Sequence, residues 1–359
     1  MHSSTSNFDF QREIPQLPWR GLLLATLLLT GLGTLAWELR VRAWGYGPTL
    51  NDTADLWADA RERVEPESIV IIGDSRALFN SDLDVLEQGL GRRPVQLAIA
   101  GTCAFPVLEN LAADETFRGT VISSLIPLMW MAPPPSPPFQ NSVKAIKRYE
   151  TRNVAQRTGH QLGMIMEERL AFLKQDELTL NQFLKGLELP ERSDFHGPPR
   201  LPPYFQSTER DRQTRMVPAA AVPGPLQDRI KAVWLPLFTP PPPPRHVPPE
   251  AFAKGMGAAM EKRFADTAAA VKKIQGRGGK VVFVRYPVTG ELKKHEDTLT
   301  PRQGPWTRIL NESGAAGIHF EDHPELAGFD CPEWSHLSGP DAGEFSKRLV
   351  PYLKAALAK

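Results

Sequence analysis

Five short runs of apolar residues, rich in valine and isoleucine, constrain the fold of this chain most strongly. They occupy residues 68–72, 95–100, 119–127, 280–285 and 317–320. Such runs are typical of strands that are buried on both faces of a parallel sheet. Segments with helical spacing of apolar residues accompany them, at 82–90, 102–113, 250–277, 307–313 and 342–357. This alternation predicts an α/β fold with about five parallel strands and with helices on both faces of the sheet.

The alternation breaks between residues 131 and 250. The chain has 35 prolines, and proline-rich runs at 133–138, 198–203 and 240–244 are unable to enter a helix. Residues 142–186, in contrast, have the spacing of helices. We therefore expect an insertion that consists of a helical pair followed by a proline-rich loop. A disordered linker is the alternative for residues 196–249.

The N-terminal residues predict a membrane anchor. Residues 21–37 (GLLLATLLLTGLGTLAW) carry no charge, and their seventeen positions are at the short end of what spans a hydrocarbon core of about 30 Å. A cleaved signal peptide is one alternative, but the end of the stretch is a poor cleavage site. A buried core helix is the other, although it would carry polar residues on one face. We expect an uncleaved signal anchor with Trp19 and Trp37 near the two membrane interfaces.

Charge does not orient this anchor, because two arginines precede it and two follow it. The usual behaviour of N-terminal anchors predicts a single-pass protein of the inner (cytoplasmic) membrane whose folded part lies outside the cytoplasm. The chain then divides into a tail (residues 1–20), an anchor (21–37), a linker (38–66) and one α/β domain. The domain has two parts, 67–130 and 251–359, which the insertion of residues 131–250 separates.

The composition excludes several classes of function. Lys and Arg number 42 against 41 Asp and Glu, so no global charge attracts nucleic acid, and no basic stretch is interleaved with aromatics. Cys103 and Cys331 are too few for a cysteine-rich metal site, and the histidines lack paired ligand spacing. We therefore expect no metal and no cofactor. Outside the cytoplasm the two cysteines could form a disulfide, and the alternative is two buried thiols.

Polar residues at the predicted strand ends suggest nucleophilic catalysis. Ser75 follows the first strand at a tight turn that opens a helix, which exposes its hydroxyl and directs backbone N–H groups at an oxyanion. A serine needs an adjacent base, and His336 fits that role, with Glu333 to orient its ring. Asp330 is the alternative orienting acid. Taken singly, Ser75 could be a helix N-cap and His336 a structural histidine, whereas their joint placement at one edge of the sheet favours function.

These residues resemble the SGNH/GDSL hydrolase superfamily. Residues 71–76 (IIGDSR) are similar to its first block, Gly101 to its second-block glycine, and residues 333–336 (EWSH) to its fifth block, with glutamate in place of aspartate. The resemblance covers residues 68–127 and 280–357. It implies a three-layer α/β/α flavodoxin-like fold, a triad of Ser75, His336 and Glu333, and an oxyanion hole formed by the N–H groups of Ser75 and Gly101.

The third block departs from that pattern. The family has an oxyanion-hole asparagine there, whereas this chain has no asparagine before position 141 in the corresponding segment. One such donor is worth about 3–4 kcal/mol in the transition state, so its loss needs compensation. Ser124, a backbone N–H or Arg285 could substitute. Arg285, Arg76 and Ser124 are also candidates for substrate binding, although Arg285 could equally pair with a helix and Arg76 could face solvent or pair with Asp74.

The departure and the anchor resemble the alginate-O-acetyltransferase-like branch of the superfamily. This implies a serine esterase or O-acyltransferase that acts on acylated saccharide or a similar cell-envelope substrate. The expected partners are an acyl ester or acyl-donor protein, a saccharide and a membrane-bound acyl-transfer partner. The alternative is a membrane-tethered binding or assembly protein for envelope polysaccharide that keeps the fold with weak catalysis.

Overall fold

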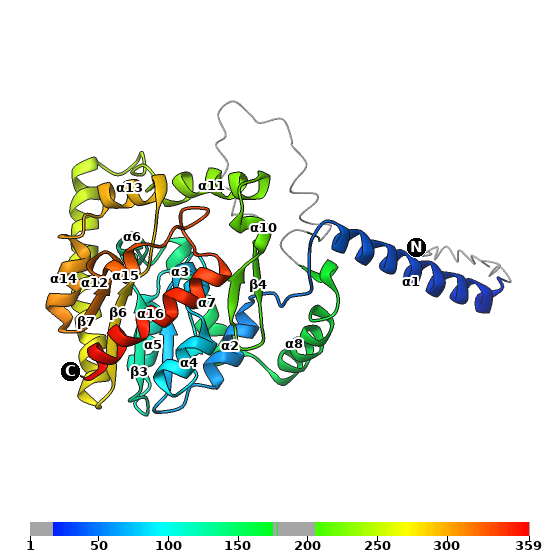
Figure 1. Ribbon diagram of the computed structural model, residues 1–359, viewed down its shortest axis with the longest axis horizontal. Helices are drawn as coiled ribbons and strands as arrows, with labels where there is room; N and C mark the ends of the chain where they lie inside the picture. Colours follow the sequence, from blue (N-terminus) through cyan, green and yellow to red (C-terminus); the bar gives the residue numbers. More distant parts are fainter. Residues whose placement is uncertain (1–16, 175–177, 179–204, 359) are drawn as a thin grey trace, which may run out of the picture.

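A parallel sheet of five strands organises the chain, as the computed structural model of residues 17–174, 178 and 205–358 shows (Figure 1). All neighbouring strands are parallel. Their order is β2-β1-β3-β6-β7. The expected α/β class and five-stranded parallel sheet are therefore confirmed. The strands are β1 (Ile69–Ile72), β2 (Val95–Gln96), β3 (Thr120–Ser124), β6 (Lys280–Arg285) and β7 (Ala316–His319).

Side chains of the sheet enter two separate hydrophobic clusters because successive residues of a strand point to opposite faces. Ile71 of β1 enters one cluster, whereas Val70 and Ile72 enter the other. The first cluster includes residues of α3 (Ser75–Asn80), α4 (Leu83–Leu90), α10 (Pro218–Ala221), α11 (Pro225–Phe238), α13 (Gly290–Leu299), α15 (Pro324–Ala327) and α16 (Gly339–Ala358). The second includes residues of α2 (Ala54–Glu62), α5 (Phe105–Ala113), α6 (Pro127–Trp130), α7 (Pro137–Thr151), α12 (Pro249–Gly276) and α14 (Pro305–Ser313).

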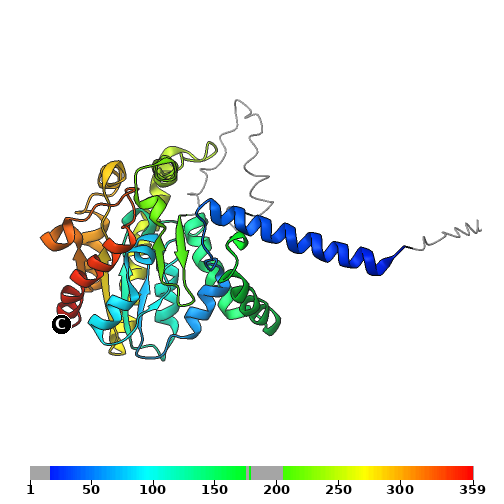
Figure 2. The same ribbon diagram turned by 45° about the vertical axis from the view of Figure 1, so that its right-hand side comes forward.

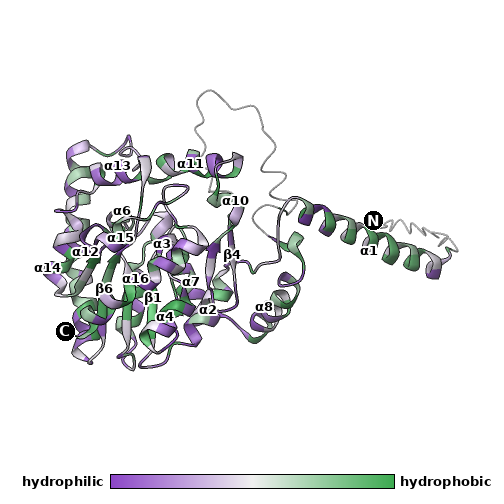
Figure 3. Ribbon diagram, in the orientation of Figure 1, coloured by the Kyte–Doolittle hydropathy of each residue, from purple (hydrophilic) through white to green (hydrophobic). Residues whose placement is uncertain are grey.

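One helix near the N-terminus, α1 (Trp19–Ala43), is long and apolar enough to cross a membrane. Its most apolar 18 residues have a mean hydropathy of 1.7, and it projects away from the body of the molecule (Figure 3). The helix begins two residues before the predicted span of 21–37 and ends six residues after it. Its C-terminal end is fixed to the body, because the Glu38 carboxylate accepts hydrogen bonds from the backbone N–H groups of Ala171 and Phe172.

The segment 38–66, expected to be a polar linker, is largely part of the folded body. It ends α1 and contains α2, which begins after an N-cap at Thr53. The side chain of Trp57 is buried in the second cluster, and its indole N–H donates to the carbonyl of Leu97 at 2.9 Å. The polar residues of this helix are engaged by the rest of the body, since Arg61 is buried and Asp55 and Asp59 pair with arginines of α7 and the residue that follows it.

The insertion contains more structure than its prolines suggest. The expected helical pair is α7 with α8 (Val154–Glu167). The proline-rich loop or linker expected next is wrong for residues 206–238, which form an antiparallel hairpin of β4 (Gln206–Thr208) and β5 (Thr214–Met216) and then α10 and α11. The proline run at 240–244 does lie in a loop, between α11 and α12. Several prolines stand at the first turn of a helix, where the missing N–H has no cost. The run at 198–203 lies outside the described residues. Short 3₁₀ turns complete the elements, at Ala171–Leu173 and Phe320–Asp322.

Candidate active site

The turn between β1 and α3 is built by Gly73 and Asp74. A Cβ atom on Gly73 would lie 2.5 Å from the Cβ of Ser124 and 2.7 Å from that of Ala77, so only glycine fits between strand and helix. Asp74 is the N-cap of α3, since its carboxylate accepts the backbone N–H of Arg76 at 2.8 Å. The Ser124 hydroxyl donates to the same carboxylate at 3.0 Å. Burial raises the pKa of Asp74, although the charge of Arg76 opposes this.

Ser75 is the first residue of α3 and is half-buried. Its hydroxyl makes no hydrogen bond to any residue that the structure describes. Its backbone N–H belongs to the first turn of the helix, where amides have no intrahelical acceptor. Because Asp74 provides the N-cap, the reading of Ser75 as a capping serine is wrong, and its hydroxyl is available for chemistry.

Glu333 holds the imidazole of His336 in one orientation. Its Oε1 lies 3.0 Å from His336 Nδ1 and also accepts the backbone N–H groups of His336 and Ser335. Its Oε2 accepts the indole N–H of Trp234 at 2.5 Å. Both side chains of the pair are fully buried. Glu333 is therefore placed to fix the ring tautomer in which Nδ1 carries the proton.

The other ring nitrogen of His336 has no partner. Nε2 is buried and makes no hydrogen bond among the described residues. The ring packs against Phe79 of α3, with centroids 4.5 Å apart, and against Phe205 and Trp234 at 5.6 Å each. A buried polar atom without a partner costs about 1–3 kcal/mol. Other buried atoms among the described residues share this state, such as Nε2 of His295, so the free nitrogen of His336 indicates a site only together with the Glu333 contact at Nδ1.

The loop that carries this pair has a strained backbone. Trp334, between Glu333 and His336, has a backbone φ of 78°, which residues other than glycine rarely adopt. The Trp334 carbonyl accepts the backbone N–H of Thr289 at 2.9 Å, and a Cβ on Gly290 would lie 2.3 Å from the indole. Strain of this kind costs about 1–3 kcal/mol and clusters at functional sites.

The two predicted segments lie side by side, but the expected hydrogen bond is not formed. Arg76 Nε lies 3.3 Å from Ser335 Oγ, and the backbone N–H of Leu337 donates to Asn80 Oδ1 at 2.9 Å. The loop thus runs along α3, the helix that Ser75 begins. Ser75 Oγ and His336 Nε2 share no hydrogen bond in this structure. Catalytic hydrogen bonds are often long before substrate binds.

Arg76 and Arg285 share one buried carboxylate. Arg76 pairs with both oxygens of Glu296, at 2.5 and 3.0 Å, and Arg285 pairs with Oε2. Burial alone would raise the pKa of Glu296, but the two guanidinium groups lower it to about 2. Solvent exposure or pairing with Asp74 was expected for Arg76, and both expectations are wrong because Glu296 engages it. Arg285 pairs with Glu296 of helix α13, as the alternative prediction of a salt bridge to a helix had it. Its Nη1 has no partner among the described residues.

The remaining predicted residues are spread more widely. Gly101 is exposed in the loop after β2, with a φ of 68° and open space around it. Ser124 is buried and its hydroxyl donates to Asp74, so that proton is not available to a substrate, and its role in substrate binding stays a prediction. Asp330 is exposed and accepts the Thr289 hydroxyl, whereas Glu333 alone of the two acids contacts the imidazole.

The two cysteines are unbridged and belong to different hydrophobic clusters, so the disulfide expected as one alternative is absent. Burial raises the pKa of both thiols, which favours the neutral form of each. Among the described residues no group of three His, Cys, Asp or Glu side chains is arranged to hold a metal ion.

Several residues of the site were not predicted from the sequence. Trp234 and Phe205 come from the insertion, and Glu296 comes from a helix that lacked a strong periodic signal. No local pattern marks them, because their partners are distant in sequence. Asn80 is the exception, because it follows the Gly-Asp-Ser turn by about one helical turn, and its side-chain oxygen accepts the backbone N–H of Leu337 beside His336.

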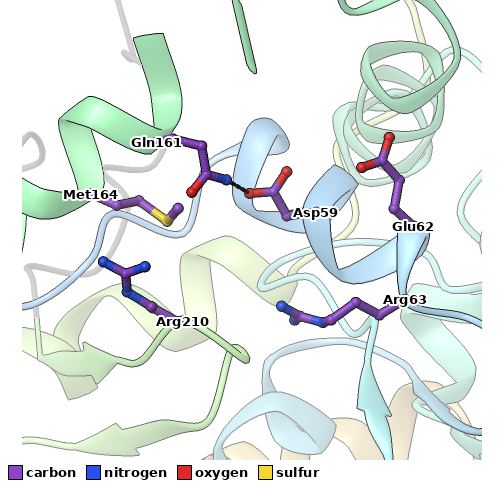
Figure 4. Close-up of a pocket in the computed structure, with 6 residues that line it drawn as sticks. All are labelled: Asp59, Glu62, Arg63, Gln161, Met164 and Arg210. Atoms are coloured by element: carbon purple, nitrogen blue, oxygen red, sulfur yellow. Dashed lines mark hydrogen bonds between the residues drawn. The ribbon is translucent and has the colours of Figure 1, made fainter. Parts of the chain in front are cut away.

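A cleft of about 280 Å³ lies elsewhere, between α2, α8 and the turn of the β4–β5 hairpin. Figure 4 shows its lining, in which Gln161 Nε2 donates to Asp59 Oδ2 at 2.8 Å. None of the predicted catalytic residues lines it. The lining is Asp59, Glu62, Arg63, Gln161, Met164 and Arg210.

Comparison of the chain with protein-family models, with curated proteins and with solved structures finds no match. The function of the site has therefore to be argued from its own geometry.

Proposed function

We propose that this protein is a membrane-anchored serine esterase or O-acyltransferase of the SGNH type, with Ser75, His336 and Glu333 as its triad. The proposal includes a three-layer, flavodoxin-like arrangement of the α/β domain. Two separate hydrophobic clusters that share the same strands support that layering. The strand order β2-β1-β3-β6-β7 supports it too, because flavodoxin-like sheets have the corresponding order.

The proposed chemistry follows from the atoms at the end of β1. Ser75 Oγ attacks an ester carbonyl while His336 Nε2 takes its proton, and Glu333 stabilises the imidazolium through Nδ1–H. The N–H groups of Ser75 and Gly101 bind the oxyanion. The imidazolium then gives its proton to the leaving alcohol, which leaves an acyl group on Ser75. Water or a saccharide hydroxyl takes the acyl group in the second half of the reaction, with His336 again acting as base.

The single observation that carries the proposal is the state of the His336 ring. Its Nδ1 is fixed by a buried carboxylate that has four donors, whereas its Nε2 is buried without a partner. Nε2 of His295 is also buried without a hydrogen bond among the described residues, but of these two rings only that of His336 has its Nδ1 on a buried carboxylate. An imidazole held at one nitrogen and free at the other, on a loop alongside α3, has the arrangement that a general base for Ser75 needs.

The substrate class follows from the anchor and from Arg285. A domain tethered by α1 acts on material at a membrane, which for an extracytoplasmic domain of the inner membrane includes acylated envelope saccharide. An acyl-donor protein or a membrane-bound acyl-transfer partner would supply the acyl group. The unpaired Nη1 of Arg285 is a candidate donor to an anionic group of such a substrate.

Labelling with a fluorophosphonate probe tests this proposal, because the probe reacts with activated serines. The purified full-length protein in detergent should label, and Ser75→Ala should abolish labelling. Ser207→Ala, at an exposed serine of β4, is the matched control and should label fully. A folded wild-type protein that does not label, or a Ser75→Ala variant that labels as well as wild type, would refute the proposed nucleophile.

A second candidate function is a membrane-tethered binding or assembly protein with weak catalysis. The absence of a hydrogen bond between Ser75 and His336 favours it, as does the engagement of Ser124 with Asp74 where an oxyanion donor would be needed. Assays of the protein on acetyl esters, with and without oligosaccharide acceptors, separate the two. Saccharide binding without turnover in either assay would favour the binding protein.

A further inference from the structure

Helix α8 has its apolar and polar faces reversed relative to an ordinary surface helix. Of its apolar side chains only Met164 is buried, while polar residues face α2, where Arg157 pairs with Glu62 at 2.6 Å and Gln161 donates to Asp59 at 2.8 Å. Its outward side chains are apolar and largely exposed. We call these the outer face of α8: Val154 (77% exposed), Leu162 (60%), Ile165 (44%) and Met166 (51%).

This outer face is continuous with the region where α1 meets the body. The chain that leaves α8 forms the 3₁₀ turn to which Glu38 is bound, and Arg42 Nη2 donates to the carbonyl of Arg169 at 2.9 Å. Val41 and Ala171 pack together in a small cluster. The C-terminal end of α8 is therefore held next to the last turns of α1.

The direction of the outer face follows from the views of the molecule. In Figures 1 and 2, α8 lies on the side of the body from which α1 projects, and in the view of Figure 1 it runs steeply across the direction of α1. Since the inner face of α8 contacts α2, its outer face looks away from the body toward the region that surrounds α1. A helix of 14 residues in that position extends about 21 Å across this side.

We propose that the outer face of α8 rests in the lipid headgroup boundary of the membrane that α1 spans. This inference depends on the proposed anchoring by α1. A helix with one apolar face and one polar face, lying across the membrane normal, has the form of an interfacial helix. Exposed apolar side chains in a row favour such a surface over water. Arg169, exposed at the end of α8, would face anionic headgroups.

A bilayer fits this face better than a protein partner does because α1 already brings the lipid to it. The contact would fix the body in one orientation to the membrane through two elements, α1 and α8. The edge of the sheet that carries Ser75 would then be held at a constant height above the lipid, where a membrane-bound acyl donor would present its group.

Spin labels at single introduced cysteines test the proposal in the full-length protein, reconstituted in vesicles of phosphatidylethanolamine and phosphatidylglycerol. Labels at Leu162→Cys and Val154→Cys report on α8, Leu29→Cys reports on α1, and Lys347→Cys in α16 is the exposed control. The native cysteines are buried, and the wild-type chain measures their background labelling. The measured quantity is the ratio of label accessibility to oxygen, which enters lipid, and to a water-soluble nickel complex.

The ratio at positions 162 and 154 should be higher than at 347 and lower than at 29. A ratio at 162 and 154 equal to that at 347, with 29 in lipid, would overturn this inference and leave the anchor intact. A label at 29 that is open to the nickel complex would overturn the anchor and this inference together. Shielding of 162 from both reagents would mean that another protein covers the face, which also overturns it.

Discussion

Replacement of Glu296 by glutamine should destabilise the protein by about 3 kcal/mol at neutral pH. The carboxylate is 1% exposed and faces two buried guanidinium groups, so the change leaves Arg76 and Arg285 without a countercharge. A carboxyl whose pKa falls from 4.5 to about 2 on folding contributes about 3 kcal/mol. The loss of one member of a buried ion pair costs about 3–5 kcal/mol, which agrees with this value.

The effect should also depend on pH. Because the pKa of Glu296 is lower in the folded protein than in the unfolded chain, the unfolded chain binds more protons in acid. The contribution is therefore complete above about pH 4.5 and is lost as the pH falls toward 2. The variant should differ from wild type most at neutral pH, and the two should approach each other in acid.

Urea denaturation of the full-length protein in detergent measures both effects, since urea does not screen charges. Asp297→Asn is the matched control on the same helix. Asp297 is exposed, and its one ion pair among the described residues is with Lys293, one turn earlier on the helix. The free energy of unfolding of this control should fall by less than about 0.5 kcal/mol. A Glu296→Gln variant as stable as the control at pH 7, or a difference that does not shrink in acid, would refute the reasoning.

Three further changes have defined outcomes. Gly73→Ala should lower the free energy of unfolding by about 1–3 kcal/mol, because the new Cβ would press on the Cβ atoms of Ser124 and Ala77. The control, Gly255→Ala, lies in a helix with open space around it and should be neutral or stabilising in the same urea titration. Trp234→Phe keeps an aromatic ring but removes the donor to Glu333, so ester turnover should fall about tenfold while the thermal midpoint changes little; an unchanged rate would contradict this. Glu333→Gln should reduce turnover by about 10²-fold or more while fluorophosphonate labelling slows in parallel, and labelling at the wild-type rate would refute its role.

The sheet could be predicted because its strands are short, apolar and buried, and such runs differ clearly from helices. The β4–β5 hairpin could not. Its strands have three residues each, and it is held by contacts distant in sequence, such as Arg212 with Asp52. The reversed polarity of α8 was equally hidden, because helical spacing identifies two faces but not which one meets the protein.

The site could be predicted where spacing is local. Glu333 and His336 are three residues apart, and this spacing placed the carboxylate on the imidazole. Arg76 was misjudged because its partner, Glu296, is 220 residues away and no pattern links them. Likewise, nothing in a proline-rich segment indicated that Trp234 would donate to Glu333.

Trapping of an acyl-enzyme tests the central claim most directly. The protein is incubated with an acetyl ester, quenched in acid and digested, and the acetylated residue is located by mass spectrometry. The proposed mechanism predicts acetyl on Ser75 in wild type, and its loss in Ser75→Ala and His336→Ala. Acetyl that accumulates on another residue at the catalytic rate, or turnover that persists in Ser75→Ala, would contradict it.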